Sequence, residues 1–303
     1  MKYKVFESSE GNVFKYIFEP EDAVVEAVLY RYNDFYERTV ICCSTMSGCP
    51  VGCKFCGTGK NFIRNLSDDE IVEQIDLILK DKNIEDVDKN GRRFQIMFMS
   101  MGEPLLNWDN VEFAIERLNE KYPNAELLLS TIAPWSDSYT RLIEISKRIP
   151  KVGLQFSIHK STDAERSVLI PFEEKLSISQ IRDFGLIWWK ETGRKPYLNY
   201  CIDGTNSKKE DSDKLQDMFS PVVFCLTFSV VCSKDENMKE AGFKKIDQIR
   251  KFEQKFTSKG YDTRVFNPAG QDDIGGGCGQ LWYVQKWMKN HLNKITTGGN
   301  HDD

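Results

Sequence analysis

Three cysteines in one short run could hold a metal centre. Cys49, Cys53 and Cys56 have the spacing C-x3-C-x2-C within CPVGCKFC. Thiolates at this spacing can wrap one loop around a cubane cluster and bind three of its irons, which leaves the fourth iron without a protein ligand. The run therefore predicts a [4Fe–4S] cluster with one iron open to a small molecule.

Zinc is the main alternative for these cysteines. A structural zinc site normally has four ligands, and the fourth could come from Cys42, Cys43 or a distant residue. The chain has only three histidines, at positions 159, 291 and 301. Buried packing cysteines are a second alternative, but glycines interleave the run, which is unlike a packed core. We favour the cluster.

Composition points to a reducing compartment. The 303 residues include nine cysteines, an odd number, and the first residues lack the apolar segment of a signal peptide. Disulfide stapling is therefore a poor explanation for the cysteines, and we expect a cytoplasmic protein. No apolar run is long enough to cross a bilayer. The net charge of −5 argues against broad, non-specific nucleic-acid binding.

The elements that must position these cysteines alternate along the chain. A β-hairpin is predicted over residues 2–19. Apolar runs then predict strands over 38–44, 94–99, 125–130, 152–157, 196–202 and 222–231. Helical periods follow Ser67, which has capping-box spacing to Glu70, and cover 108–121, 137–147, 177–192, 208–219, 245–258 and 280–290.

Such alternation predicts an α/β fold with a parallel sheet and right-handed crossovers. We expect a partial (β/α)6 barrel, with a doubly wound sheet as the alternative. The expected organisation is a small N-terminal β-hairpin extension over 1–36, a core over 37–291 and a disordered tail over 292–303. We also expect a monomer.

Several stretches together resemble a known family. The segment CCSTMSGCPVGCKFCGTG at 42–59 is similar to that of the radical S-adenosylmethionine (SAM) methyl synthases of the RlmN/Cfr type. The resemblance spans roughly residues 26 to 281 and includes MGEPLLN at 101–107, LST at 129–131, SIH at 157–159 and GCGQL at 277–281.

The resemblance implies cofactors and a pocket for them. The cluster on Cys49, Cys53 and Cys56 would bind SAM through its open iron and split it to a 5′-deoxyadenosyl radical. Further residues are expected to line the SAM pocket at the ends of strands, with the first two contacting the SAM amino group. They are Gly102, Glu103, Ser130, Ser157 and His159.

The resemblance also implies a catalytic set. Cys278 lies in the glycine-rich loop GGGCG and would carry the methyl group before its transfer. Cys42 would release the product by attacking the Cys278 sulfur and closing a disulfide. Its neighbour Cys43 points to the opposite face of a strand and is expected in the core. Glu26 resembles the proton-accepting glutamate of the family.

Family members methylate an adenine of 23S ribosomal RNA, and some also act on tRNA. The leading hypothesis is therefore radical methyl transfer to an sp2 carbon, adenine C2 in rRNA or tRNA, with a flavodoxin or ferredoxin as electron donor. The first rival is the same chemistry on another RNA, a nucleotide or a protein. The second rival is a non-catalytic iron–sulfur or zinc protein, which would need neither Cys42 nor Cys278.

Three departures bear on the substrate. Family members carry an N-terminal helical domain, whereas this sequence opens almost directly on the predicted hairpin. The family's Ile-Pro-x-Asn stretch is FSVVCS at 228–233 here, and its basic run before the last cysteine is FNPAGQDD at 266–273. Positive charges that would have met phosphates are thus replaced. The sequence predicts retained chemistry and altered recognition.

Overall fold

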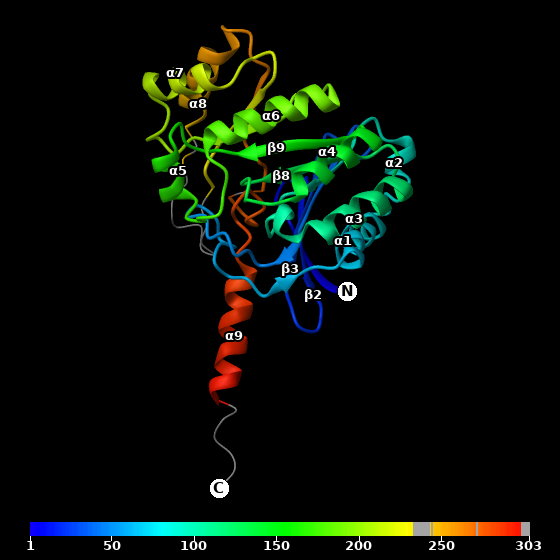
Figure 1. Ribbon diagram of the computed structural model, residues 1–303. Helices are drawn as coiled ribbons and strands as arrows, with labels where there is room; N and C mark the ends of the chain where they lie inside the picture. The colour runs from blue at the N-terminus through cyan, green and yellow to red at the C-terminus, as the bar shows by residue number, and fades with distance from the viewer. Residues whose placement is uncertain (233–242, 244, 271, 298–303) are drawn as a thin grey trace.

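The computed structural model describes residues 1–297 except 233–242, 244 and 271. One ten-stranded sheet runs through it in the order β1-β2-β3-β4-β7-β8-β9-β10-β11-β12, with helices packed along it (Figure 1). From β4 onward, spatial order follows chain order. A doubly wound sheet reverses its strand order at a switch point, so this sequential order supports the predicted barrel and excludes the doubly wound alternative.

Seven neighbouring strands are parallel, one more than predicted. The extra strand is the last, whose four residues TRVF carry too short an apolar pattern to separate from a loop. The parallel strands are β4 (Arg38–Cys43), β7 (Phe94–Phe98), β8 (Glu126–Thr131), β9 (Val152–Ser157), β10 (Tyr197–Cys201), β11 (Cys225–Ser229) and β12 (Thr263–Phe266).

The N-terminal strands continue this sheet. β1 (Lys2–Glu7) and β2 (Val13–Glu19) form the predicted hairpin, and β3 (Val25–Tyr32) pairs antiparallel with both β2 and β4. The sequence analysis missed β3 as a strand. Because β3 joins the hairpin to β4, the N-terminal hairpin extends the main sheet at one edge.

The helices alternate with the parallel strands. The capping box is confirmed, since Ser67 Oγ accepts from the Glu70 amide at 3.2 Å and Glu70 Oε2 accepts from the Ser67 amide at 3.0 Å. The helices are α1 (Asp68–Asp81), α2 (Val87–Asn90), α3 (Trp108–Lys121), α4 (Ser138–Arg148), α5 (Asp163–Leu169), α6 (Ile178–Thr192), α7 (Lys209–Met218), α8 (Ile246–Thr257) and α9 (Tyr283–Thr297), with a 3-10 turn η1 (Pro104–Asn107).

The last helix projects from the body of the protein (Figure 1). α9 continues to Thr297, so the first part of the predicted disordered tail is helical; residues 298–303 lie outside the described residues. No helix in the described part of the chain is long and apolar enough to cross a bilayer.

Strand alternation divides the interior into two parts. Ile41, Ile96 and Leu127 point to one face and pack with helix residues in the main core. Val40 and Met97 point to the opposite face and belong to a second cluster. Since successive side chains of a strand point to opposite faces, every second residue of the parallel strands faces the inside of the barrel.

Candidate active site

The three clustered cysteines lie on a loop that follows β4. A short ribbon, β5 (Met46–Ser47) paired with β6 (Arg64–Asn65), closes its base. Gly48 adopts φ +79°, and a Cβ there would lie 1.5 Å from the Asn61 carbonyl oxygen. Only glycine fits this position, because a side chain would clash with backbone that cannot move aside.

The three cysteines of this loop are half-buried, and their thiols lie close enough for their charges to interact. Burial raises the pKa of Cys49 to about 12, while hydrogen bonds from the Val51 and Gly102 amides act to lower it. Burial, followed by the nearby Cys56 and Cys49, raises the pKa of Cys53. Backbone amides beside thiolate sulfurs are one of the means by which proteins tune iron–sulfur clusters. These residues therefore fit a cluster.

The donor arrangement is unlike a zinc site. Within the described residues, no group of three or more His, Cys, Asp or Glu side chains converges on the position of one ion. A zinc ion needs its ligands to meet within about 2.0–2.3 Å of one point.

The residues predicted to line a SAM pocket lie at the carboxyl ends of neighbouring strands. Gly102 and Glu103 follow β7, Ser130 is in β8, Ser157 ends β9, and His159 follows it. Adjacent strand ends share one edge of a parallel sheet, so the fold brings these five residues to the edge at which the cysteine loop also lies.

Glu103 is held in one orientation. Its buried carboxylate accepts hydrogen bonds from the Leu105 amide at 3.1 Å, the Thr131 hydroxyl at 2.6 Å and the Ile132 amide at 2.8 Å. Burial raises the pKa of Glu103 to about 7, although these three hydrogen bonds act to lower it. Its carboxylate thus fixes the loop after β7 to the end of β8.

His159 connects the loop to the next strand. Its ring meets the Phe55 ring edge-on, with centroids 5.0 Å apart, and Nδ1 accepts from the Cys201 amide at 3.1 Å. Burial lowers the pKa of His159 to about 3, so the imidazole is neutral at physiological pH. Ser130 accepts from Gln155 Nε2 at 3.0 Å.

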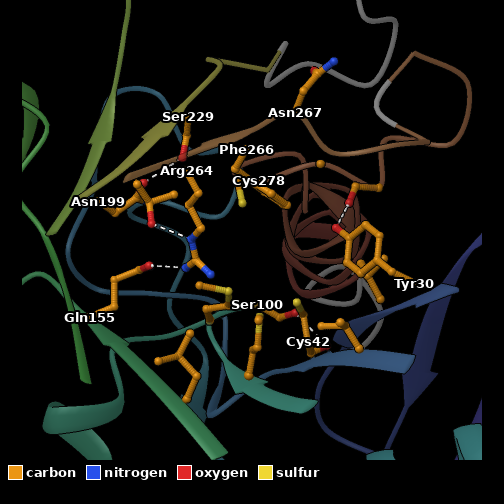
Figure 2. Close-up of a pocket in the computed structure, with 18 of the residues that line it drawn as sticks. Tyr30, Cys42, Ser100, Gln155, Asn199, Ser229, Arg264, Phe266, Asn267 and Cys278 are labelled. Carbon is orange, nitrogen blue, oxygen red and sulfur yellow. Dashed lines mark hydrogen bonds between the residues drawn. The ribbon is translucent and has the colours of Figure 1, made fainter. Parts of the chain in front are cut away.

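A cavity of about 370 Å³ occupies the inside of the barrel. Cys42 from β4 and Cys278 from the glycine-rich loop both line it (Figure 2). Burial raises the pKa of Cys42, with the neighbouring Cys278 as the second cause. Both thiols are free. Cys43 is buried in the main core on the opposite face, as predicted.

The Cys278 loop is attached to the cysteine loop. The Gly57 amide donates to the Gly279 carbonyl at 2.7 Å, and the Thr58 hydroxyl donates to the Leu281 carbonyl at 2.6 Å. The Tyr30 hydroxyl donates to the Gly276 carbonyl from β3. Residues that are distant in the sequence therefore place Cys278 between the predicted cluster and the cavity.

Glu26 is not brought to this cavity. Its side chain is completely buried, with Oε1 2.9 Å from Lys15 Nζ and Oε2 accepting from the Tyr283 amide at 2.9 Å. Burial raises the pKa of Glu26, while Lys15 acts to lower it. Val28, two residues along β3, lines the cavity, but Glu26 does not.

Sequence reasoning missed most of the polar residues in the cavity. Arg38, Gln155, Ser229 and Arg264 line it (Figure 2 labels the last three). A signal for Arg38 was present, because Arg38, Val40 and Cys42 alternate along one strand and must share a face. Among the stretches that depart from the family, residues 233 and 271 lie outside the described residues.

Comparison with known proteins gives one consistent result. Residues 43–184 match the family described as the Radical SAM superfamily. The "Probable dual-specificity RNA methyltransferase RlmN" of Petrotoga mobilis is 34% identical over 283 residues, which cover 88% of this chain and 74% of that protein. The protein of the same name from Thermotoga petrophila is 32% identical over 271 residues, covering 88% and 75%.

A solved structure has the same fold. The crystal structure of a radical SAM methyltransferase from Sphaerobacter thermophilus superposes with a TM-score of 0.79 at 25% sequence identity. The match covers 92% of this chain and 80% of that one.

Proposed function

The chain belongs to the radical SAM superfamily and, within it, to the RlmN family of methyltransferases, and from this premise we propose that it methylates an sp2 carbon by way of a methylated Cys278. One observation carries the proposal: Cys42 and Cys278 line the same cavity beside the loop of Cys49, Cys53 and Cys56. A non-catalytic metal protein has no use for two free thiols at that place.

The cofactors follow from the family. Cys49, Cys53 and Cys56 would hold a [4Fe–4S] cluster, and Gly102, Glu103, Ser130, Ser157 and His159 would surround SAM. When bound, these groups supply the methyl group, an electron and a radical able to abstract hydrogen. The contribution of the chain is to bury this site, to fix Glu103 at the end of β8, and to keep His159 neutral.

The two thiols would act in sequence. Cys278 gives up its proton and takes the methyl group as a thioether, which holds the carbon inside the cavity. Once that carbon is bonded to the substrate, the Cys42 thiolate attacks the Cys278 sulfur. The sulfur–carbon bond breaks, its electron pair stays with the product carbon, and that carbon takes up a proton to become a methyl group. The two cysteines close a disulfide that must be reduced before the next turnover.

We assign no proton transfer to Glu26. Its carboxylate is bound to Lys15 and to the Tyr283 amide, and it lies outside the cavity lining. The proton that leaves the substrate carbon would need an acceptor inside the cavity or on the substrate itself.

We propose adenine C2 in a structured RNA, rRNA or tRNA, as the substrate atom. Support comes from the two relatives described above, both named as probable dual-specificity RNA methyltransferases. A flavodoxin or ferredoxin would supply electrons. The same chemistry on another substrate is the second candidate, and the acidic balance of the chain together with the uncharged stretch at 266–270 favours it.

The first test concerns the chemistry. Protein reconstituted without oxygen is incubated with SAM and a reductant, and the products are separated by mass spectrometry. We expect 5′-deoxyadenosine together with a methyl group on the peptide that contains Cys278. An intact cluster that yields neither product would rule out the proposal, and a Cys225→Ala variant serves as the matched cysteine control.

The second test identifies the substrate. A Cys42→Ala variant expressed in cells should accumulate a covalent adduct on Cys278, because no thiol remains to release it. Sequencing or mass analysis of the attached molecule names the substrate. An adduct to adenine in RNA supports the leading proposal, whereas an adduct to a free nucleotide or a peptide supports the second candidate.

A further inference from the structure

The cavity continues to the opposite end of the barrel, where arginines line it. Arg38 begins β4, Arg93 directly precedes β7, and Arg264 lies in β12. Arg38 and Cys42 are on the same face of one strand, about 13 Å apart along it at the usual rise per residue. The lining residue Arg93 is exposed, so the cavity reaches the surface at this end.

Among the described residues, neither Arg38 nor Arg264 forms an ion pair; each guanidinium group lies over a tyrosine ring, 4.4 Å from the Tyr32 centroid and 4.7 Å from the Tyr197 centroid. No Asp or Glu lines the cavity in the part of the chain that the structure describes. Arg38 Nε donates to Gln95 Oε1 at 3.0 Å, and Arg264 donates to Thr227 Oγ1 at 2.7 Å and to Gln155 Oε1 at 3.3 Å. These acceptors are all neutral.

The carboxylate of Glu126, which contacts Arg93, is already paired. Glu126 is paired with Arg93 at 2.8 Å and also accepts from Gln95 Nε2 at 2.7 Å. Burial lowers the pKa of Arg264, and the charges of Arg38 and Arg93 lower it further. Unpaired cations in a half-buried site cost free energy, so they are expected where a bound anion compensates them.

The other residues that line the cavity, and its volume, indicate which kind of anion it would bind. A planar guanidinium group can donate two parallel hydrogen bonds to two oxygens of one phosphate. Between the arginines and the two thiols, Val40, Met97 and Leu128 form apolar walls. A volume of about 370 Å³ is in the range of small-molecule sites. A cavity with a cationic end and an apolar middle matches a nucleotide, which joins an anionic phosphate to a base, better than it matches a free base.

We propose that Arg38 and Arg264 bind the phosphate of an adenine nucleotide whose base lies toward Cys42 and Cys278. The inference rests on the proposed function in one respect, since it takes the cavity as the place where the substrate reacts. It adds the group by which the substrate is recognised.

Equilibrium binding to the cluster-loaded protein tests the site without any turnover. Titration calorimetry under nitrogen compares AMP, adenosine and inorganic phosphate as ligands. We expect AMP to bind about tenfold or more tightly than adenosine, which is the size expected for losing a charge-assisted contact. Inorganic phosphate should compete with AMP and leave adenosine binding unchanged.

Variants assign the effect to the two arginines. Arg38→Gln and Arg264→Gln should each abolish the preference for AMP. Arg38→Lys should retain part of it, because lysine keeps the positive charge but lacks the planar pair of donors. Arg141→Gln, a surface arginine paired with Asp109 and Glu112, is the control and should behave as wild type. Arg264 also joins three strands, so Arg38→Gln decides the matter if Arg264→Gln is unstable.

The outcomes are distinct. No measurable AMP binding, equal binding of AMP and adenosine, or a preference for AMP that survives both glutamine variants would overturn the site. If binding of a short oligoadenylate is weakened by the same arginine variants, the recognised phosphate belongs to an RNA chain. If only AMP binding is weakened, the recognised phosphate belongs to a free nucleotide. The binding test consumes no SAM, so a failure to bind AMP would not contradict the methyl-transfer proposal. A failure to form 5′-deoxyadenosine would, in turn, not contradict the proposed phosphate site.

Discussion

Lys15 and Glu26 form an ion pair that water does not reach: Nζ lies 2.9 Å from Oε1, and the two side chains are 1% and 0% exposed. Lys15 Nζ also donates to the carbonyls of Gly275, at 3.3 Å, and Gln280, at 3.2 Å, on either side of Cys278. The pair therefore fastens the Cys278 loop to β2 and β3, which makes both members positioning residues.

Breaking this pair should be costly. Lys15→Met leaves the Glu26 carboxylate buried without its partner, so we expect the free energy of unfolding to fall by about 3–5 kcal/mol. The double variant Lys15→Met with Glu26→Leu should lose less than the sum of the single changes. Anaerobic denaturant unfolding measures both. Lys4→Met, from the exposed pair with Glu19, is the control and should leave the free energy of unfolding close to that of wild type.

Gly48→Ala should prevent cluster loading. The added methyl group would overlap the Asn61 carbonyl, and the positive φ adds strain. We expect the iron content per chain to fall to a small fraction of wild type. Gly193→Ala is the matched control: its φ is +70° but nothing lies within 4 Å of the added carbon. That variant should keep its iron and lose only about 1–2 kcal/mol.

Tyr30→Phe should loosen the Cys278 loop. The lost hydroxyl leaves the buried Gly276 carbonyl without this donor, at a cost of about 1–3 kcal/mol. Methylation of Cys278, followed by peptide mass spectrometry, should slow while iron content is unchanged. Tyr36→Phe removes an exposed hydroxyl bonded to Asp86 and should leave both readouts alone. Equal methylation rates in the two variants would show that this contact has no positioning role.

His159 should make the fold acid-sensitive. Its pKa is about 3 in the folded state and near 6.5 in an unfolded chain. As the pH is lowered, His159 is therefore protonated in the unfolded state before it is protonated in the folded state. The free energy of unfolding should decrease as the pH drops below about 6.5, by at most about 1.4 kcal/mol per pH unit.

His159→Asn removes this titration, and asparagine tolerates the φ of +57° at this position. The difference in melting temperature between about pH 7.5 and about pH 5.5 should thus be smaller in the variant than in wild type. A variant that is as acid-sensitive as wild type would assign the effect to other groups.

Local signals in the sequence were sufficient for the cysteine loop and for most elements. The spacing of Cys49, Cys53 and Cys56 and the cap at Ser67 depend only on nearby residues, and the structure contains the expected loop and helix. β3 was missed because its pairing with β2 and β4 involves residues distant in the chain. β12 was missed because four residues carry too little periodicity.

The environment of charged residues was harder to predict. Lys15 stands in VFKYIFE, where alternation alone suggests a solvent-facing position, yet its partner comes from the next strand and its acceptors from near the C-terminus. Glu26 was assigned a proton-accepting role by resemblance, and only its contacts reveal the ion pair. Arg264 could not be placed without β12. Each requires long-range packing, which a linear pattern does not contain.

The bond between Glu26 and the Tyr283 amide joins residues 257 positions apart. During synthesis, the cysteines that would coordinate metal leave the ribosome long before the cysteine that would take up the methyl group. A nascent chain could thus acquire its iron while its reaction chamber is still open at one side. Methyl transfer would have to wait until the final segment docks.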